Sequence, residues 1–376
     1  MSDFDYAIVG AGINGCALAY FLTQTGASVA LVDATGIAAG GSGAAGAFIA
    51  PKITKSGPLK EISDAAFEFS LAFYNEHFPQ AITNAPLLHL AKHHDENSKV
   101  AYFKAHTPLH VSEPDEALWQ RLQPHCKEYE ALYLEQSAVV DAQQMCAQLA
   151  ADAVLCVASV EMASYNNERW HLGGLTCKQV IFATGAYTPV LHLPYLKLRG
   201  VWGHRIDIAT STEIPLNIHQ QVSISKSTHG KAAIGATHNV HYHPQSNMPY
   251  DVDAGRAELL QKAAFTLDLG RVEVVHDYMG LRSGSNDYLP MIGSLVDADA
   301  TLQKLPESIK GHTYAREDLC YFKNAYMING TGGYGFVLGP WLAKNLAEYL
   351  LFSKPIDTRI EPTRFYERWV KKGVLA

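Results

Sequence analysis

The stretch that decides the fold is Ile8-Val9-Gly10-Ala11-Gly12-Ile13-Asn14-Gly15, close to the amino terminus. It follows a short apolar run, Tyr6 to Val9, and leads into apolar-periodic residues from Cys16 to Thr25. A second apolar run ends at Asp33, about 20 residues beyond the glycines. Strand, glycine turn, helix and strand, with an acid at the end of the second strand, form the pattern of a dinucleotide-binding unit. We therefore predict such a unit at the start of the chain.

Each residue type in this unit has a physical reason. Gly10 allows a tight turn, Gly12 lets the backbone approach a pyrophosphate, and Gly15 lets the helix pack close to the strand. The helix N-terminus favours the negative phosphates. Asp33 can accept hydrogen bonds from a ribose. The predicted cofactor contacts here are Gly10, Gly12, Ile13, Asn14, Gly15, Asp33 and Ala34.

Composition limits the class of protein. The chain has 376 residues, 48% of them hydrophobic, which is enough for two domains with their own cores. The formal charge of −7 argues against broad nucleic-acid binding but permits a local basic patch. Its 6 cysteines lack metal-ligand spacing, as is typical of reduced thiols. No uncharged apolar run of about 18 residues is present, so we expect no membrane insertion and a cytoplasmic enzyme.

The order of patterns along the chain predicts an α/β fold with two interleaved domains. Parallel strands are expected at the start, near residues 179–186 and near 325–328, and alternating patterns between 199 and 243 predict antiparallel strands. A final helix is expected from about Gly339, with Pro340 in its first turn. We expect a Rossmann-like cofactor-binding domain (1–80, 135–200 and 320–376) and an inserted α+β substrate or cap domain with an antiparallel sheet (81–134 and 201–319).

Three further small-residue segments suit a flavin better than a nicotinamide. The first, residues 40–47, would let the backbone approach a bulky planar ring, and a flexible surface loop is its alternative. The second ends the strand near residue 182. The third, residues 330–335, precedes the last helix, whose N-terminus would stabilise negative charge on a reduced ring. The predicted contacts are Gly41, Ser42, Gly46, Ala47, Ala183, Thr184, Gly185, Gly330, Gly332, Gly333, Tyr334 and Gly335.

A fourth segment, residues 280–293, contains the candidate substrate anchor. Arg282 offers a bidentate fork for a carboxylate and would also lie near the cofactor. The alternative for Arg282 is a structural ion pair with Asp287, five residues further along. From the residues alone, the two interpretations are equal.

Taken together, these segments resemble the D-amino-acid-oxidase superfamily of FAD-dependent oxidoreductases, over nearly the whole chain. The resemblance rests on the glycine fingerprint, Ala183-Thr184-Gly185, Ile234-Gly235-Ala236-Thr237, the segment from Gly280 to Gly293 and the glycine turn before the last helix. The chain is similar in particular to one branch, the FAD domain of the bifunctional tRNA 5-methylaminomethyl-2-thiouridine biosynthesis proteins. Four segments carry that similarity: residues 42–51, the helix ending in Phe69, Phe73 and Tyr74, the segment from Gly280 to Gly293, and the basic tail from Arg364 to Lys372.

The resemblance implies an FAD-dependent oxidation of a C–N bond to an imine, which water hydrolyses. In that branch a carboxymethylaminomethyl group on the tRNA wobble uridine becomes aminomethyl, with release of glyoxylate. The alternatives are a small-molecule amine oxidoreductase acting on glycine, sarcosine or a D-amino acid, and a flavoprotein scaffold without turnover. The expected partners are therefore tRNA or a small amine.

The implied chemistry needs few catalytic side chains, because the cofactor carries the hard step. Arg282 would anchor the substrate carboxylate, while Tyr334 and Tyr288 would order the substrate or cover the ring, with packing as their alternative role. Relatives that attach the flavin covalently use a cysteine ahead of the last strand, where this chain has His312-Thr313-Tyr314-Ala315. We expect FAD to be held non-covalently.

Two other features, a pair of histidines and the basic tail, each have a structural and a functional interpretation. His241 and His243 share one face of an extended segment, but no third ligand has useful spacing, so we expect no metal site. The basic tail could contact a tRNA backbone, or it could be a solvated helix face docked by its aromatic residues. Its cations are Arg359, Arg364, Arg368, Lys371 and Lys372.

Overall fold

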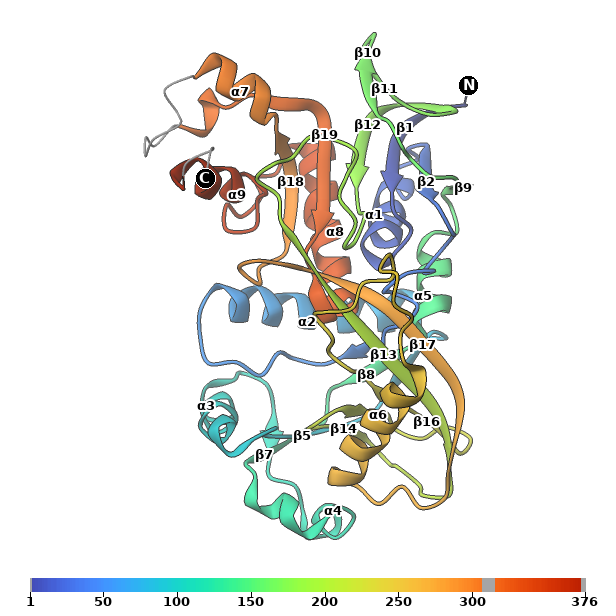
Figure 1. Cartoon of the computed structure of the whole chain (residues 1–376). Coiled ribbons are helices and arrows are strands. Elements are labelled where there is room, and N and C mark those ends of the chain that lie inside the picture. Colours follow the sequence, from blue (N-terminus) through green and yellow to red (C-terminus); the bar gives the residue numbers. More distant parts are fainter. Residues whose placement is uncertain (1, 306–314, 373–376) are drawn as a thin grey trace. The chain divides into compact units, whose positions relative to one another are not determined.

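The computed structural model describes residues 2–305 and 315–372 (Figure 1). The chain forms two compact units. Unit 1 consists of Met1–Ala39, Cys146–Gly200 and Arg282–Ala376, and unit 2 consists of Gly40–Met145 and Val201–Leu281. The chain therefore crosses between the units after residues 39, 145, 200 and 281.

Unit 1 is built on a sheet whose centre is parallel. Its parallel strands, in spatial order, are β9 (Val154–Val157), β2 (Val29–Asp33), β1 (Ser2–Val9), β12 (Leu175–Phe182) and β19 (Tyr321–Asn329). Its antiparallel additions are β10 (Ser164–Asn166), β11 (Arg169–Leu172) and β18 (Met291–Val296). The central strands read as continuous apolar runs because both faces are covered, as is usual for parallel sheets. Ile8, Leu31 and Ile181 accordingly have no exposed surface.

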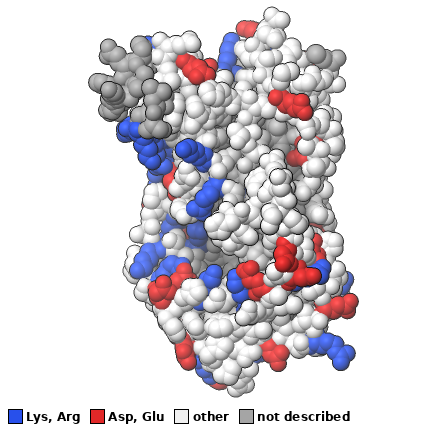
Figure 2. Space-filling model, viewed as in Figure 1, with Lys and Arg blue, Asp and Glu red and all other residues white. Residues whose placement is uncertain are grey.

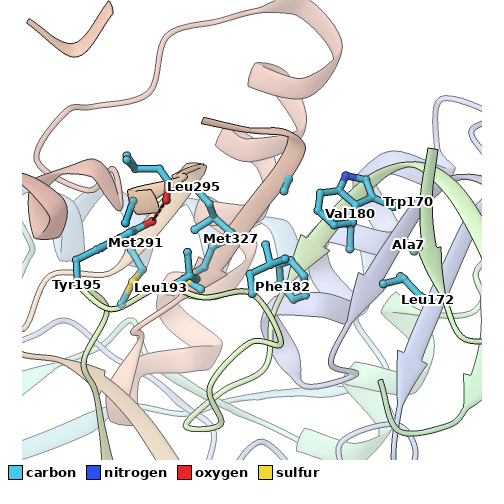
Figure 3. Packing of buried hydrophobic residues seen from close by; sticks show 14 of the residues in the cluster. Ala7, Trp170, Leu172, Val180, Phe182, Leu193, Tyr195, Met291, Leu295 and Met327 are labelled. Atoms are coloured by element: carbon cyan, nitrogen blue, oxygen red, sulfur yellow. Dashed lines mark hydrogen bonds between the residues drawn. The ribbon is translucent and has the colours of Figure 1, made fainter. Parts of the chain in front are cut away.

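Helices cover this sheet and close its core. They are α1 (Ile13–Thr23), α7 (Ala298–Lys304), α8 (Gly335–Phe352) and α9 (Thr363–Lys371), with short 3-10 turns at Arg316–Asp318 and Gly332–Tyr334. Figure 1 shows α1 and α8 side by side. Figure 3 shows part of the buried core of this unit, in which Phe182, Leu193, Tyr195 and Met327 belong to one cluster. The Tyr195 hydroxyl donates to the carbonyl oxygen of Val296 over 3.0 Å, so its polar end is satisfied within the core.

Unit 2 contains a largely antiparallel sheet of eight strands. Their spatial order is β17 (Val272–Ser285), β13 (Leu198–Thr210), β16 (Lys231–Gly235), β15 (Ser223–Ile224), β14 (Asn217–His219), β5 (Leu87–Leu90), β7 (Ala131–Leu134) and β6 (Val111–Ser112). The β14–β5 pair is parallel. Helix α6 (Val252–Thr266) covers one face, where Leu259 and Ala263 pack on Ile206, Ile208 and Ile234.

A second, small sheet completes unit 2. It consists of β3 (Phe48–Ile49), β8 (Ala138–Val140) and β4 (Ile82–Asn84). The remaining elements are α2 (Pro58–His77), α3 (Asn97–His106), α4 (Glu116–Trp119), α5 (Ala142–Leu149, which runs into unit 1) and 3-10 turns at His94–Glu96 and Pro124–Glu128. No helix among the described residues is long and apolar enough to cross a bilayer.

The predicted α/β class is confirmed, with a parallel-centred sheet and a separate antiparallel sheet. One element boundary was wrong: α8 begins at Gly335, not near Gly339, so Pro340 lies inside the helix. The units also group residues 40–80 and 135–145 with unit 2, and residues 282–319 with unit 1. The reason is strand pairing, because β3, β8 and β4 form one sheet and β18 pairs with β19. The assignment of a cofactor domain and a cap domain remains a prediction.

Candidate functional site

The glycine-rich segments that belong to unit 1 meet at one edge of its sheet. Gly10 follows β1, Asp33 ends β2, Ala183 follows β12 and Gly330 follows β19. These strands are parallel neighbours, so their carboxyl ends lie along the same edge. Ligands of open α/β sheets bind outside such an edge. The sequence motifs, separated by up to 320 residues, are thus brought to one place.

The first turn is shaped by backbone contact. Gly10 has φ of +112°, and a Cβ there would lie 2.3 Å from the carbonyl oxygen of Ala183. A Cβ at Gly15 would lie 1.9 Å from the carbonyl oxygen of Gly10. Gly12 is the N-cap of α1 and supplies no side chain that would cover the helix N-terminus. Glycine is therefore required at Gly10 and Gly15 by the turn itself, before any ligand is considered.

Asp33 holds this turn to the end of β2. Its Oδ2 accepts the N–H of Ala11 over 2.9 Å, and its Oδ1 accepts the N–H groups of Thr35 and Gly36 over 2.9 and 3.1 Å. A carboxylate offers about four acceptor sites, so Oδ2 retains room for a further hydrogen bond. Asp33 thus organises the loop, a role that was not predicted from the sequence, and it still suits the predicted ribose contact. Ala34 is exposed beside it.

Asn329, at the end of β19, connects three segments of the edge. Its Oδ1 accepts the Ser283 hydroxyl over 2.8 Å and the Gly330 N–H over 2.7 Å. Its Nδ2 donates to the carbonyl oxygen of Gly185 over 2.9 Å. Asn329 has no exposed surface, so these bonds fix the relative positions of β12, β17 and β19 at their ends. Asn329 was not among the residues predicted from the sequence, although its position directly before the glycine turn was a usable signal.

The N-termini of α1 and α8 approach each other at the same edge. A Cβ at Gly335 would lie 3.0 Å from Cγ2 of Ile13, and one at Gly339 would lie 3.1 Å from Oδ1 of Asn14. That Oδ1 is buried without a hydrogen-bond partner among the described residues, while Nδ2 of Asn14 donates to Thr331 over 3.5 Å. Two adjacent helix N-termini with a spare buried acceptor fit a large anionic group that also carries N–H or O–H donors.

Space remains beside the turns after β12 and β19. No described atom lies within 4 Å of the position that a Cβ would take at Gly185 or at Gly332, and both glycines have positive φ. The residues present therefore fit an extended dinucleotide such as FAD along this edge. Thr184 lies in the same turn, and its hydroxyl donates to the carbonyl oxygen of Tyr187 over 2.7 Å.

Arg282 lies next to the glycine turn that precedes α8. It is in the last part of β17, and a Cβ at Gly333 would lie 3.9 Å from its Cδ. Gly284, two residues further along, pairs with Thr331 of the turn. Burial lowers the pKa of the Arg282 guanidinium, but its ordinary pKa is so far above neutrality that the group stays charged at pH 7. Unit 1 thus presents a half-buried cation beside the turn.

Asp287 binds other arginines, which removes the basis for the predicted structural ion pair with Arg282. Arg364 donates to it through Nε and Nη2 over 2.9 and 3.1 Å, and Arg368 donates through Nη1 over 2.5 Å. These arginines lower the pKa of Asp287 to about 2 against the opposing effect of burial. Arg364 is only 5% exposed, so it is a structural cation that docks α9. Two cations of the basic tail are therefore engaged in the fold.

The two tyrosines differ. Burial raises the pKa of Tyr334 to about 12, so its phenol is a neutral donor at the start of α8. Tyr288 is 62% exposed, has φ of +63°, and lies under the guanidinium of Arg199, which also donates to its hydroxyl over 3.0 Å. Tyr334 thus lies in the glycine turn near Arg282, whereas Tyr288 lies on a surface turn. Their catalytic roles remain predictions.

The remaining predicted contacts, Gly41, Ser42, Gly46 and Ala47, belong to unit 2. Their loop packs on β17, since a Cβ at Gly280 would lie 2.7 Å from Cα of Gly41. Arg205 fixes the loop further by donating to the carbonyl oxygen of Ala45 over 2.6 Å. The loop is therefore anchored within unit 2, in contrast to a freely flexible surface loop.

The sequence predicts neither a metal site nor a covalent link to the flavin. Among the described residues, no group of three or more His, Cys, Asp or Glu side chains could hold a metal ion. The expected place of a covalent flavin link, His312 to Tyr314, lies outside the described residues. None of the 6 cysteines forms a disulfide.

Comparison with known proteins gives a family. The model of the FAD-dependent oxidoreductase family, DAO, matches residues 5–349. The match includes every segment of the edge described above.

Curated relatives share low identity over most of the chain. The tRNA 5-methylaminomethyl-2-thiouridine biosynthesis bifunctional protein MnmC of Dichelobacter nodosus is 26% identical over 98% of this chain and 59% of its own length. The protein of the same name from Legionella pneumophila is 22% identical over 97% of this chain and 58% of its own length. The chain thus spans less than two thirds of these relatives.

Solved structures share the fold. Glycine oxidase from Geobacillus kaustophilus matches with a TM-score of 0.74 at 21% identity, covering 97% of this chain and 99% of that one. Iminodiacetate oxidase from Chelativorans sp. BNC1 matches with a TM-score of 0.72 at 17% identity over 95% and 98% of the two chains. L-proline dehydrogenase from P. horikoshii matches with a TM-score of 0.75 at 15% identity over 97% and 98%.

Proposed function

The chain belongs to the FAD-dependent oxidoreductase family, and on this premise we propose that it oxidises the C–N bond of an N-substituted glycine. The proposed substrate is the carboxymethylaminomethyl group of a tRNA wobble uridine. The products are aminomethyl-uridine and glyoxylate. The alternative substrate is a free amine such as glycine or sarcosine.

The proposed cofactor contacts follow the edge of unit 1. Gly10 to Gly15 and the N-terminus of α1 would hold the pyrophosphate, and Asp33 would accept a ribose hydroxyl. The turns at 183–185 and 330–335 would approach the rest of FAD without covalent attachment. When bound, FAD supplies the acceptor for the two electrons and the hydrogen removed from the carbon next to nitrogen.

One observation carries the substrate proposal: the Arg282 side chain lies beside Gly333, in the turn where the flavin of this family would be approached. A guanidinium offers two parallel N–H donors to a carboxylate, which is the group that an N-substituted glycine presents. The half-buried position strengthens such a pair, because water competes less. Arg282 would then hold the substrate so that its methylene carbon points at the acceptor.

Tyr334 suits the other requirement of the reaction. The amine must be neutral when its neighbouring carbon loses hydride, because a protonated amine has no lone pair to form the imine. A buried phenol that stays neutral can accept or donate a hydrogen bond without adding charge. Water then adds to the imine, and the C–N bond breaks to leave an amine on one side and glyoxylate on the other.

The tRNA substrate is supported by the named relatives and by exposed cations near the carboxyl terminus. Basic side chains gather in the region of α9, at the upper left of the view (Figure 2). Lys371 and Lys372 are exposed there, whereas Arg364 and Arg368 bind Asp287. The free-amine alternative is supported by the fold shared with glycine oxidase and iminodiacetate oxidase.

Anaerobic mixing, followed through the flavin absorbance, tests the proposal. Bleaching by tRNA that carries carboxymethylaminomethyl-uridine, and not by the same tRNA without that group, is the expected result. Bleaching by glycine or sarcosine alone would replace the tRNA substrate by the alternative. If neither tRNA nor any free amine reduces the flavin, amine oxidation is wrong and a scaffold without turnover remains.

A further inference from the structure

Unit 2 contains a cavity that shares a single residue, Gly46, with the predicted cofactor contacts. Its volume is about 340 Å³, within the range of small-molecule sites. One wall is the face of the eight-stranded sheet opposite α6, because Arg205 and Asp207 alternate along β13 with Ile206 and Ile208, which pack under α6. The other wall is formed by β8 and the start of α5, residues 139–143.

We propose that this cavity binds the phosphate group of a phosphate ester, such as a nucleotide. The inference does not depend on which amine is oxidised. It rests on three cationic side chains, Arg205, Lys226 and Lys231, that line the cavity from different segments of unit 2. Two carboxylates, Asp207 and Asp141, line it as well, so cations exceed anions.

Contacts within unit 2 hold the Arg205 side chain in place, but one of its N–H donors has no acceptor in the part of the chain that the structure describes. Its guanidinium lies 3.8 Å from the ring centre of Tyr278, Nη1 donates to the carbonyl oxygen of Ala45 over 2.6 Å, and Nη2 lies 3.4 Å from Asp207. The side chain is 12% exposed, and Nε is buried without a hydrogen-bond partner among the described residues. A buried N–H without an acceptor is unfavourable, so a ligand oxygen at Nε would satisfy it.

The two lysines differ from Arg205 because their charged groups are not held by neighbouring described residues. In the described part of the chain, neither the Lys226 nor the Lys231 ammonium has a hydrogen-bond or ion-pair partner. Only their backbone groups are engaged, Lys226 through its N–H to Oδ1 of Asn217 and Lys231 in a pair with Thr228. Both ammonium groups can therefore turn toward a shared anion without breaking an existing ion pair.

The two acids are already engaged. Asp207 pairs with Arg205, and Asp141 accepts the N–H of Gln144 at the start of α5. An anion entering the cavity thus meets three donors whose charge is only partly compensated. A phosphate monoester, with nearly two negative charges and three terminal oxygens, matches one guanidinium and two ammonium groups better than a single carboxylate does. Hydroxyls of Thr83 and Thr228 line the same cavity and suit a sugar.

The test uses FAD-loaded protein and isothermal titration calorimetry with uridine 5′-monophosphate, inorganic phosphate and tRNA as separate probes. The test variant is the double Lys226→Gln/Lys231→Gln. The control is Lys178→Gln/Lys323→Gln, which removes the same charge from exposed lysines of unit 1. Arg205→Lys keeps the charge but removes the fork. Thermal melts establish whether each variant folds. If Arg205→Lys does not fold, the lysine double and its control are enough to test the site.

We expect the test double to weaken uridine monophosphate binding at least about tenfold, with the control unchanged. If the nucleotide does not bind but tRNA binding weakens in the test double alone, the phosphate comes from RNA. Equal effects of both doubles, or no dependence of any probe on Lys226 and Lys231, would overturn the site. Flavin reduction by amines is measured separately for the lysine double, because Lys226 and Lys231 are not assigned to the oxidation, whereas Arg205 also holds the loop of the predicted flavin contacts.

Discussion

At the level of single residues, Arg282 is the sharpest test of the proposed substrate. Arg282→Lys would replace a two-point contact by one, and Arg282→Ala would remove it, beside Gly333 of the turn before α8. A charge-assisted hydrogen bond contributes about 1.5–3 kcal/mol, so we expect KM for a carboxylate substrate to rise about 10–100-fold in Arg282→Ala. Steady-state kinetics measure this, with the exposed Arg359→Lys as control. Unchanged KM in Arg282→Ala would remove Arg282 from the substrate site.

Asn329 tests the organisation of the edge. Asn329→Ala removes its bonds to Ser283, Gly330 and Gly185 and leaves buried groups unpaired. We expect a loss of about 2–4 kcal/mol in the free energy of unfolding, measured in urea, together with weaker retention of flavin. Asn329→Asp keeps the acceptor for Ser283 and Gly330 but places a carboxylate oxygen against the carbonyl oxygen of Gly185, so it should be destabilised as well. A variant with wild-type stability would contradict this role.

At the level of elements, the turn between β1 and α1 leaves no room for a methyl group. A Cβ in Gly15→Ala would lie 1.9 Å from a backbone oxygen, which can move only if the turn itself opens. We expect Gly15→Ala to lose flavin and at least about 2 kcal/mol of stability. Gly174→Ala is the matched control, because no described atom lies within 4 Å of a Cβ there. Flavin content after purification and urea unfolding are the measurements.

Strands β5 and β14 contain a pair of buried histidines, from which we predict that the fold loses stability in acid. His89 and His219 are opposite each other, each has a buried ring nitrogen without a partner among the described residues, and their rings lie 6.2 Å apart. Burial lowers the pKa of His219 to about 3 and that of His89 to about 4, with Lys99 adding to the latter effect. Their neutral forms stabilise the fold above the unfolded pKa of 6.5, and this stability is lost as the pH falls from there toward 4 and 3.

The variant His219→Phe should reduce that pH dependence. It keeps a ring against Phe48, whose ring centre lies 4.8 Å from that of His219, and removes one titrating group. We expect the decrease in unfolding free energy between about pH 7 and about pH 4.5 to shrink by about 2 kcal/mol. Urea unfolding at a series of pH values measures it. An identical pH profile would mean that His219 does not limit stability in acid.

At the level of the whole molecule, the charge distribution predicts a modest electrostatic contact with tRNA. Net charge is −7, and two arginines of the basic tail bind Asp287, so Lys371 and Lys372 are the tail cations without an assigned structural partner in the described residues. We expect Lys371→Gln/Lys372→Gln to reduce the slope of log binding constant against log salt by about 2. Filter binding at several salt concentrations measures the slope. A slope equal to that of the unchanged protein would exclude the tail from the contact.

How much could be predicted from the sequence depended on the distance between partners. Gly10, Gly15 and Asp33 lie within one strand–helix–strand unit, so local spacing was enough to identify their turn. Asn329 and Gly185 are 144 residues apart, and Arg364 and Asp287 are 77 apart. Nothing in one sequence links such partners, because chain topology alone brings them together. For the same reason, the sequence explained Arg282 equally well by an ion pair with nearby Asp287. In the structure, Asp287 instead binds Arg364 and Arg368 of α9.

Because the chain crosses four times between the units, the two units do not obtain all of their strands at the same point of synthesis. β12 gains its parallel neighbour β19 only when residues 321–329 have been made, and α8 follows later still. Unit 2, by contrast, has all of its strands up to Leu281 available earlier. All strands of unit 2 are therefore made before β19 and α8, which complete the edge that carries the glycine fingerprint. We expect firm cofactor binding to require α8, because its N-terminus completes that edge.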